Sequence, residues 1–201
     1  MIRRPPRSTL DRSSAASDVY KRQTFSWLKI TGLDTVLGPE MKSTGEAMGH
    51  GPTFGTAYLK AMKGGNKTIP TAGTVFLSVS NKLKLEFGDV AQELRELGFK
   101  LIATKGTAAH LRKKGIDSEV IWRISDRKQP DILSVMRNKR VDLIINLPTG
   151  RRAATDGAQM RRLAVELGIP FITTITGARA AINSLKEGET EYLEPLKKIK
   201  V

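Results

Sequence analysis

Hydrophobic positions change their spacing along this chain, and the change shows where strands and helices are expected. From Thr74 onward, five short runs are apolar at nearly every position, which is typical of strands that are buried on both faces of a sheet. Turn signals bound each run, so we interpret the runs as separate strands. The expected strands are Thr74–Val79, Lys100–Thr104, Glu119–Trp122, Val141–Asn146 and Phe171–Thr174.

Segments with helical spacing follow the five runs. Gly98, Gly115 and Gly168 stand where a helix commonly ends in a left-handed residue. The expected helices are 87–97, Thr107–Lys114, Ile132–Asn138, Met160–Leu167 and Thr176–Leu185. Strands that alternate with crossover helices pair in parallel. The pattern therefore predicts an α/β fold with a doubly wound, parallel five-stranded sheet, a flavodoxin-like three-layer sandwich.

The chain divides into four segments on this basis. Residues 1–23 combine six Lys and Arg with two Asp and show no apolar periodicity, so we expect them to be disordered. Their string RSTLDRSSAASDVYKRQ looks like translated sequencing-adapter DNA, which indicates an adventitious N-terminus on a truncated chain. Residues 24–71 contain a short helical pattern near Thr53 to Met62 but too few apolar residues for a core of their own. Residues 72–186 form the expected α/β domain, and 187–201 a charged tail.

Composition excludes several classes of protein. With 39% hydrophobic and 27% charged residues, the 201-residue chain is close to globular averages. No apolar run approaches the roughly 18 residues that a membrane span needs, so we expect a cytoplasmic protein with no membrane partner. The chain has no cysteine and two histidines, which argues against a metal site and against a cysteine nucleophile.

The net charge of +14 suggests an anionic partner. Charge alone does not distinguish nucleic acid from a membrane surface or from a phosphorylated or carboxylated small molecule. Nucleic acid is the weaker hypothesis, because the cations are scattered over helices and tails and no aromatic platform for bases accompanies them.

The residues that follow the expected strands carry hydroxyl, amide or cationic groups. Ligands of an open parallel sheet bind beyond the carboxyl ends of its strands, so these residues are expected to meet at one edge. Such groups beside helix N-termini suit a phosphate or a carboxylate, because unpaired backbone N–H groups attract negative charge there. Asn146 is the most specific of them, since an amide at the end of a buried strand needs a partner. Thr107 is equally suited to cap a helix, and Trp122 to pack at the rim.

Signatures of several enzyme classes are missing. The sequence contains no GxGxxG after the first expected strand, no GxxxxGK[ST] and no GxSxG elbow. Asp126, Asp131 and Asp156 are the only acids in the loops after the third and fourth strands. A pocket with few acid–base pairs is expected to bind rather than to catalyse, so we assign no catalytic residue.

Two parts of the sequence resemble known families. The strings GFKLIATKGTAAHL (98–111), DLIIN (142–146), TGRR (149–152) and GIPFITT (168–174) resemble a methylglyoxal-synthase-like (MGS-like) domain. The string LGPEMKSTGEAMG (37–49) resembles the end of the second synthetase half of the carbamoyl-phosphate synthase large chain. The resemblance implies that 24–71 are a remnant of that ATP-grasp half and that 72–186 are the MGS-like domain.

In the family, this domain ends the large chain and regulates the enzyme by binding an effector. The effector is a nucleotide monophosphate, a phosphorylated ribose or N-acetylglutamate in different members. Carried over by position, the implied effector-binding residues are Lys84, Thr104, Thr107, Trp122, Arg123 in place of a family lysine, Asn146 and Thr149. Trp122 and the string INLP (145–148) resemble the acylglutamate-activated members.

The resemblance also implies a parent enzyme. It is an ATP-dependent ligase of pyrimidine and arginine biosynthesis that uses ATP and Mg²⁺ and works with a glutaminase small chain. The metal-binding carboxylates of the ATP-grasp domains lie upstream of Leu37 in that family and have no counterpart in this sequence. The isolated chain is therefore expected not to catalyse and to need no cofactor, and its self-association stays open.

The catalytic alternative is methylglyoxal synthase, which has the same fold. Its catalysis uses an aspartate to move protons on dihydroxyacetone phosphate. Alignment on the following strand places Gln129 at that position, and an amide cannot act as a base. Asp131 would have to replace it.

Overall fold

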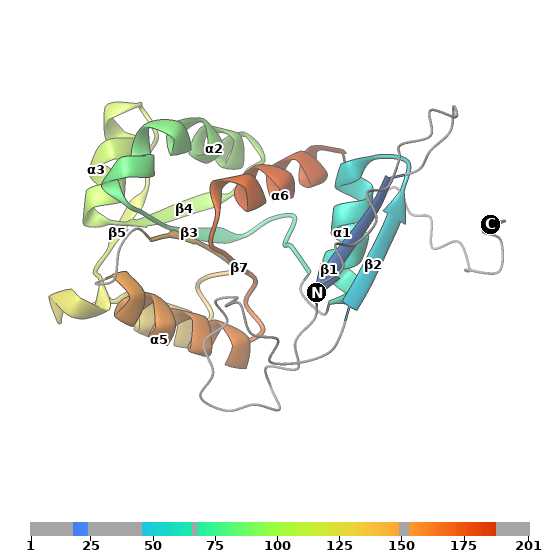
Figure 1. Cartoon of the computed structure of the whole chain (residues 1–201). Coiled ribbons are helices and arrows are strands. Elements are labelled where there is room, and N and C mark those ends of the chain that lie inside the picture. Colours follow the sequence, from blue (N-terminus) through green and yellow to red (C-terminus); the bar gives the residue numbers. More distant parts are fainter. Residues whose placement is uncertain (1–17, 24–45, 66–67, 149–152, 188–201) are drawn as a thin grey trace, which may run out of the picture.

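The computed structural model describes residues 18–23, 46–65, 68–148 and 153–187. They form a five-stranded sheet between two layers of helices, with a two-stranded sheet and one further helix beside it (Figure 1). In chain order the elements are β1 (Asp18–Gln23), β2 (Glu46–Gly51), α1 (Phe54–Gly64), β3 (Thr74–Val79), η2 (Asn81–Leu83), α2 (Lys84–Glu96), β4 (Lys100–Thr104), α3 (Lys105–Lys113), β5 (Glu119–Ile121), η3 (Ile124–Asp126), α4 (Ile132–Arg137), β6 (Leu143–Leu147), α5 (Ala153–Glu166), β7 (Phe171–Ile172) and α6 (Ile175–Glu187).

The main sheet confirms the predicted fold class. Its strands are all parallel, in the order β5-β4-β3-β6-β7. β3 and β4 have the expected bounds, whereas β5 ends at Ile121, β6 runs from Leu143 to Leu147 instead of from Val141 to Asn146, and β7 ends at Ile172. The strand order is of the Rossmann type rather than the flavodoxin type, because the chain adds β4 and β5 on one side of β3 before it crosses back to add β6 and β7 on the other.

Alternate residues of the strands face the two helix layers. Val75 and Leu77 of β3 belong to one core cluster with residues of α2, α3 and α6. Phe76, between them, belongs to a second cluster with residues of α4 and α5. The helices cover both faces of the sheet (Figure 1), so every strand position is best filled by an apolar side chain. This is why the strands read as continuous apolar runs.

Strand β1 corrects the expectation that residues 1–23 contain no ordered element. It pairs antiparallel with β2, from Asp18 opposite Gly51 to Gln23 opposite Glu46. Backbone pairing of this kind needs no apolar periodicity, so the pattern of side chains did not indicate it. Residues 1–17 and 24–45 lie outside the described residues. The expected tail does too, apart from Glu187, which ends α6.

Helix α1 connects the small sheet to the main domain. A Cβ on Gly49 of β2 would overlap the backbone carbonyl of Ala57, so glycine allows the strand and the helix to approach closely. Tyr58 and Met62 on α1 belong to the same core cluster as residues of α2 and α6. The segment 46–65 thus packs its apolar residues into the core of the main domain, consistent with its being too small for a core of its own.

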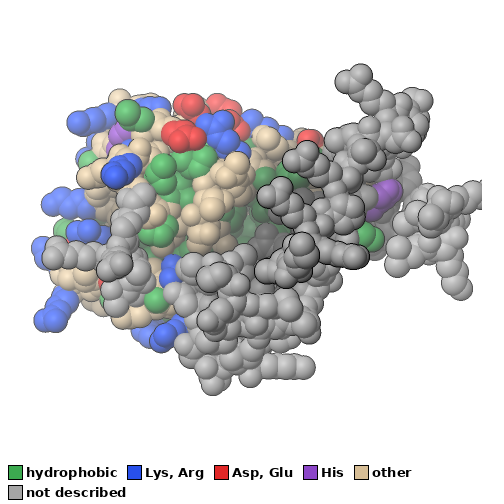
Figure 2. All heavy atoms as spheres, viewed as in Figure 1, with side chains coloured by type: hydrophobic (Ala, Val, Ile, Leu, Met, Phe, Trp, Pro, Cys, Tyr) green, Lys and Arg blue, Asp and Glu red, His purple; other side chains and the backbone are tan. Residues whose placement is uncertain are grey.

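The visible face of the molecule is unevenly charged. Figure 2 shows Lys and Arg side chains gathered at the end formed by α3 and β5, and Asp and Glu side chains over α2. Within the described ranges, none of the helices is both long enough and apolar enough to cross a membrane.

Candidate anion-binding site

A cavity of about 720 Å³ opens at the carboxyl edge of the main sheet. Its walls come from the ends of β3, β4 and β6, from the first turns of α2, α3 and α5, and from η3. The strand order reverses between β3 and β6. In doubly wound sheets, ligands bind in the crevice at such a reversal. The cavity therefore lies where the topology predicts a binding site.

Three neighbouring strands each contribute a polar side chain to the cavity. Ser78 of β3 is opposite Asn146 of β6 in the strand register, and Thr104 ends β4. In each strand, the residue two positions earlier packs in the core cluster with α4 and α5. Because side chains of a strand alternate between the two faces of the sheet, Ser78, Thr104 and Asn146 all point toward that same helix layer. Thr104 and Asn146 are buried, and all three line the cavity. The expected convergence of hydroxyl and amide groups is thus present.

Thr107 does not cap its helix. Helix α3 begins at Lys105 and its N-cap is Thr104, because β4 runs directly into the helix, so Thr107 lies in the first turn. Its buried hydroxyl accepts a hydrogen bond from the Val79 backbone N–H at 3.1 Å and one from the Thr104 hydroxyl, also at 3.1 Å. Thr107 therefore ties α3 to the end of β3 while it also lines the cavity.

Lys84 brings positive charge to the N-terminus of α3. Its ammonium group donates a 2.7 Å hydrogen bond to Asn81 Oδ1 and lies 3.3 Å from where a Cβ on Gly106 would stand. Burial lowers the pKa of Lys84, because desolvation disfavours the charged form. An ammonium group beside the positive end of a helix dipole is itself unfavourable, and a bound anion would relieve both effects.

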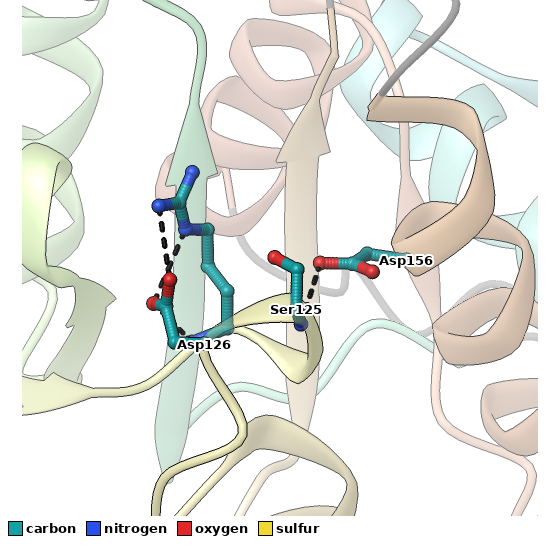
Figure 3. Close-up of polar contacts among 4 residues, drawn as sticks. Ser125, Asp126 and Asp156 are labelled. Atoms are coloured by element: carbon teal, nitrogen blue, oxygen red, sulfur yellow. Dashed lines mark hydrogen bonds and ion pairs between the residues drawn. The ribbon is translucent and has the colours of Figure 1, made fainter.

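Arg123 lines the cavity from the loop after β5 and pairs with Asp126 on the same loop. Figure 3 shows Asp126 and, further along, Asp156 facing Ser125. The Asp126 carboxylate accepts hydrogen bonds from the Arg123 side chain, with an N–O distance of 3.1 Å for the ion pair. The neighbouring Ser125 N–H donates to Asp156 Oδ2 at 3.2 Å, which joins η3 to α5. The loop is therefore held on both sides where it borders the cavity.

Two of the expected effector-binding residues are not part of the described cavity wall. Trp122 lies beside the cavity rather than on its wall. The ammonium groups of Lys105 and Lys128 lie 5.9 Å and 4.6 Å from the centre of its ring, within cation–π range. Thr149 lies outside the described residues. The structure thus brings Lys84, Thr104, Thr107, Arg123 and Asn146 onto one cavity, and their role in binding stays a prediction.

Carboxylates are scarce around the cavity. Among the described residues, Asp156 is the one acid that lines it. Asp131 instead caps α4, where its Oδ1 accepts from Ser134 N–H at 2.8 Å. In the described part of the chain, no three His, Cys, Asp or Glu side chains come close enough to hold a metal ion. The arrangement suits an anion and offers little for proton transfer.

Gly157 and Met160 line the cavity from α5 and were not among the expected site residues, although Met160 was expected to begin this helix. The helix begins at Ala153 rather than at the expected Met160, so its first turns reach the cavity. A Cβ on Gly157 would come within 2.9 Å of Arg161 Nη1 and 3.3 Å of Asn146 Nδ2. The helical spacing of Asp156, Gly157 and Met160, which places them on one face, is the signal that could have revealed them.

Comparison with known sequences gives consistent matches. Residues 86–173 match the family model of the MGS-like domain. The chain is 47% identical over 173 residues to the carbamoyl phosphate synthase large chain, C-terminal section, of Methanocaldococcus jannaschii, covering 86% of this chain and 28% of that protein. It is 45% identical over 166 residues to the carbamoyl phosphate synthase large chain of Methanobrevibacter smithii, covering 83% of this chain and 15% of that protein. The chain thus spans less than a third of the length of these relatives.

Among solved structures, methylglyoxal synthase from Elizabethkingia anophelis NUHP1 matches with a TM-score of 0.48 and 17% identity, over 57% of this chain and 79% of that chain.

The residues that match the MGS-like family model, 86–173, include four of the five strands of the doubly wound sheet, so this part of the chain is MGS-like. Over most of its length, the chain is a homologue of the C-terminal section of the carbamoyl phosphate synthase large chain. The resemblance predicted from the sequence is confirmed.

Proposed function

We propose that this chain is the regulatory part of a carbamoyl phosphate synthase large chain and binds a small anionic effector in the cavity at the carboxyl edge of its sheet. Lys84 and Arg123 supply positive charge, Thr104 and Thr107 supply hydroxyls, and Asn146 supplies an amide. Trp122 borders the same edge. The effector class is a nucleotide, a phosphorylated ribose or N-acetylglutamate.

One observation carries the proposal. The cavity places Lys84, Arg123 and the first turn of α3 around one volume, and among the described residues a single carboxylate lines it. These two cations, a third at Lys82, which also lines the cavity, and a helix N-terminus favour an anion. The volume of about 720 Å³ leaves room for a ligand with polar groups at more than one end.

Regulation would follow from linkage. An effector that binds one conformation of the large chain better than another shifts the equilibrium by that difference in affinity, typically about 1 to 3 kcal/mol. Helix α2, which begins at Lys84, is joined to α6 by a 3.0 Å ion pair between Glu93 and Lys186, and Glu187 at the end of α6 bonds to Thr53 before α1. These contacts connect the cavity wall with the segment that precedes the domain.

The proposal extends to the segments and partners of the parent protein. Residues 24–71 are a remnant of an ATP-grasp half, residues 72–186 are the regulatory domain, and residues 1–23 are adventitious. In the intact enzyme the domain would act on a large chain that uses ATP and Mg²⁺ and is supplied by a glutaminase small chain. The isolated chain would bind its effector without turnover.

A thermal-shift screen tests the proposal. Nucleotide monophosphates, phosphoribosyl pyrophosphate and N-acetylglutamate are added separately at millimolar concentration. A ligand that binds the folded chain raises its melting temperature in a concentration-dependent way, because it stabilises the native state alone. We expect one of these classes to do so. If none of them raises the melting temperature, the proposed effector site is wrong.

A further inference from the structure

The loop after β5 carries the one arginine that lines the cavity among the described residues. The Arg123 side chain is 62% exposed, so packing against neighbouring residues does not by itself restrict it to one rotamer. If an arginine side chain becomes ordered only when an anion binds, the loss of its conformational entropy weakens anion binding. How Arg123 is held before binding therefore matters for the site.

A single carboxylate holds Arg123 at three points. Asp126 Oδ2 accepts from the Arg123 backbone N–H at 3.2 Å and from Nε at 3.3 Å, and Oδ1 accepts from Nη2 at 3.1 Å (Figure 3). Because Nε and Nη2 lie on one edge of the planar guanidinium group, Nη1 lies on the other edge, away from Asp126. Asp126 itself is not among the residues that line the cavity.

The loop that carries this pair is itself closed and anchored. At its base, Trp122 N–H donates to the Pro130 carbonyl at 3.1 Å, and Ile132 N–H donates to the Trp122 carbonyl at 3.3 Å. At its other side, the Ser125 N–H is bonded to Asp156 on α5. A clamped backbone gives Asp126 a fixed position from which to orient the Arg123 side chain.

We propose that Asp126 is a positioning residue of the anion site, which fixes the Arg123 guanidinium group before a ligand arrives and does not touch the ligand. This inference rests on the proposed function, since it assigns a role within the same site. The hydrogen bond from the Arg123 side chain lowers the pKa of Asp126, so the carboxylate is ionised at neutral pH and the ion pair is formed.

The proposal predicts whether anion binding becomes weaker or tighter when the negative charge of Asp126 is removed. If Asp126 acted only as a negative charge near the site, Asp126→Ala would tighten anion binding by removing repulsion. If Asp126 positions Arg123, the same substitution weakens binding. Titration with inorganic phosphate, followed by ¹H–¹⁵N NMR, distinguishes the two. We expect Asp126→Ala to weaken phosphate binding at least fivefold and Asp126→Asn, which keeps an oxygen acceptor, to weaken it less.

The matched control is Glu119→Ala. Glu119 accepts two hydrogen bonds from Arg140 Nη2, at 3.1 Å and 3.2 Å, and neither residue lines the cavity. This variant loses an exposed arginine–carboxylate pair elsewhere and should bind phosphate as the unmodified chain does. Unchanged or tighter binding by Asp126→Ala would overturn the proposal.

A measurement without ligand keeps the inference separate from the proposed function. The Arg123 Nε–Hε resonance should be distinct and protected from exchange in the unmodified chain and should collapse toward random-coil values in Asp126→Ala. If it is already averaged in the unmodified chain, Asp126 does not position Arg123, whatever the binding result. If no phosphate binds while the resonance behaves as expected, the anion site fails and the Arg123–Asp126 arrangement stands.

Discussion

At the residue scale, the candidate site depends on a few charged groups that line the cavity, of which Lys84 is partly buried and Arg123 is largely exposed. Burial lowers the pKa of Lys84, and its ammonium group stands near Gly106 at the start of α3. A side chain at position 106 would crowd that ammonium group, so glycine leaves room for charge at the helix N-terminus. Lys84 should therefore contribute more to anion binding than an exposed lysine does.

We predict that Lys84→Met weakens phosphate binding about 10- to 100-fold, the equivalent of the roughly 1.5–3 kcal/mol of a hydrogen bond to a charged group. Isothermal titration calorimetry at neutral pH measures the change. Lys100→Met is the matched control, because Lys100 begins β4 at the opposite edge of the sheet and does not line the cavity. Equal losses in both variants would mean that net charge, and not the cavity, binds the anion.

The direction of the Lys84 pKa shift also sets a pH dependence. An anion needs the ammonium form, so affinity should fall as pH rises through the lowered pKa of Lys84, earlier than for an ordinary lysine. The stability of the ligand-free protein should change with pH in the opposite direction to the affinity. Because the folded state disfavours the charged form, stability rises as pH increases through that pKa.

At the element scale, segment 46–65 is attached to the main domain through α1, and β2 is attached to α1 by a close approach of their backbones. β2 packs against α1 through Gly49, and α1 packs into the core of the main domain through Tyr58 and Met62. A larger residue at position 49 would meet backbone atoms of Ala57 and Ala61, which cannot rotate away as a side chain can.

We predict that Gly49→Ala destabilises the chain by about 1–3 kcal/mol, as overpacking of a tight interface does. Thermal denaturation should show a melting temperature several degrees lower. Gly64→Ala is the control, since a Cβ there would meet only the Ala47 side chain, at 3.3 Å. An unchanged melting temperature for Gly49→Ala would mean that α1 does not pack on β2 as described.

At the scale of the whole molecule, the acids near the cavity are already engaged in contacts that hold the fold together. Asp131 is used to cap α4, and Asp156, the acid at the cavity among the described residues, accepts a hydrogen bond from Ser125 N–H. Gln129, at the position implied for the family's catalytic aspartate, carries an amide. These placements favour binding over catalysis.

We predict that the chain forms no methylglyoxal from dihydroxyacetone phosphate. A colorimetric assay, with an authentic methylglyoxal synthase run in parallel, measures this. Turnover above background that disappears in Asp156→Asn would contradict the prediction and would make Asp156 the catalytic base.

Much of the fold was predictable because its signals are local. Buried parallel strands show as apolar runs, and β3 and β4 were expected with the bounds that they have. The candidate site was predictable in part, because chain direction alone places Thr104 and Asn146 at the carboxyl edge. The start of α5 was missed, and with it Gly157, because the apolar stripe on which the prediction rested begins only at Met160.

The sequence by itself determined the five strands of the main sheet, that both faces of that sheet are covered, and which polar residues follow its strands, since periodicity and chain direction act over a few residues. Only the tertiary structure decided the strand order, the pairing of β1 with β2, the bond from Thr107 to Val79 and the contact between Ser125 and Asp156. Each of these joins residues that are distant in sequence, and such contacts depend on how whole elements pack, which no local pattern encodes.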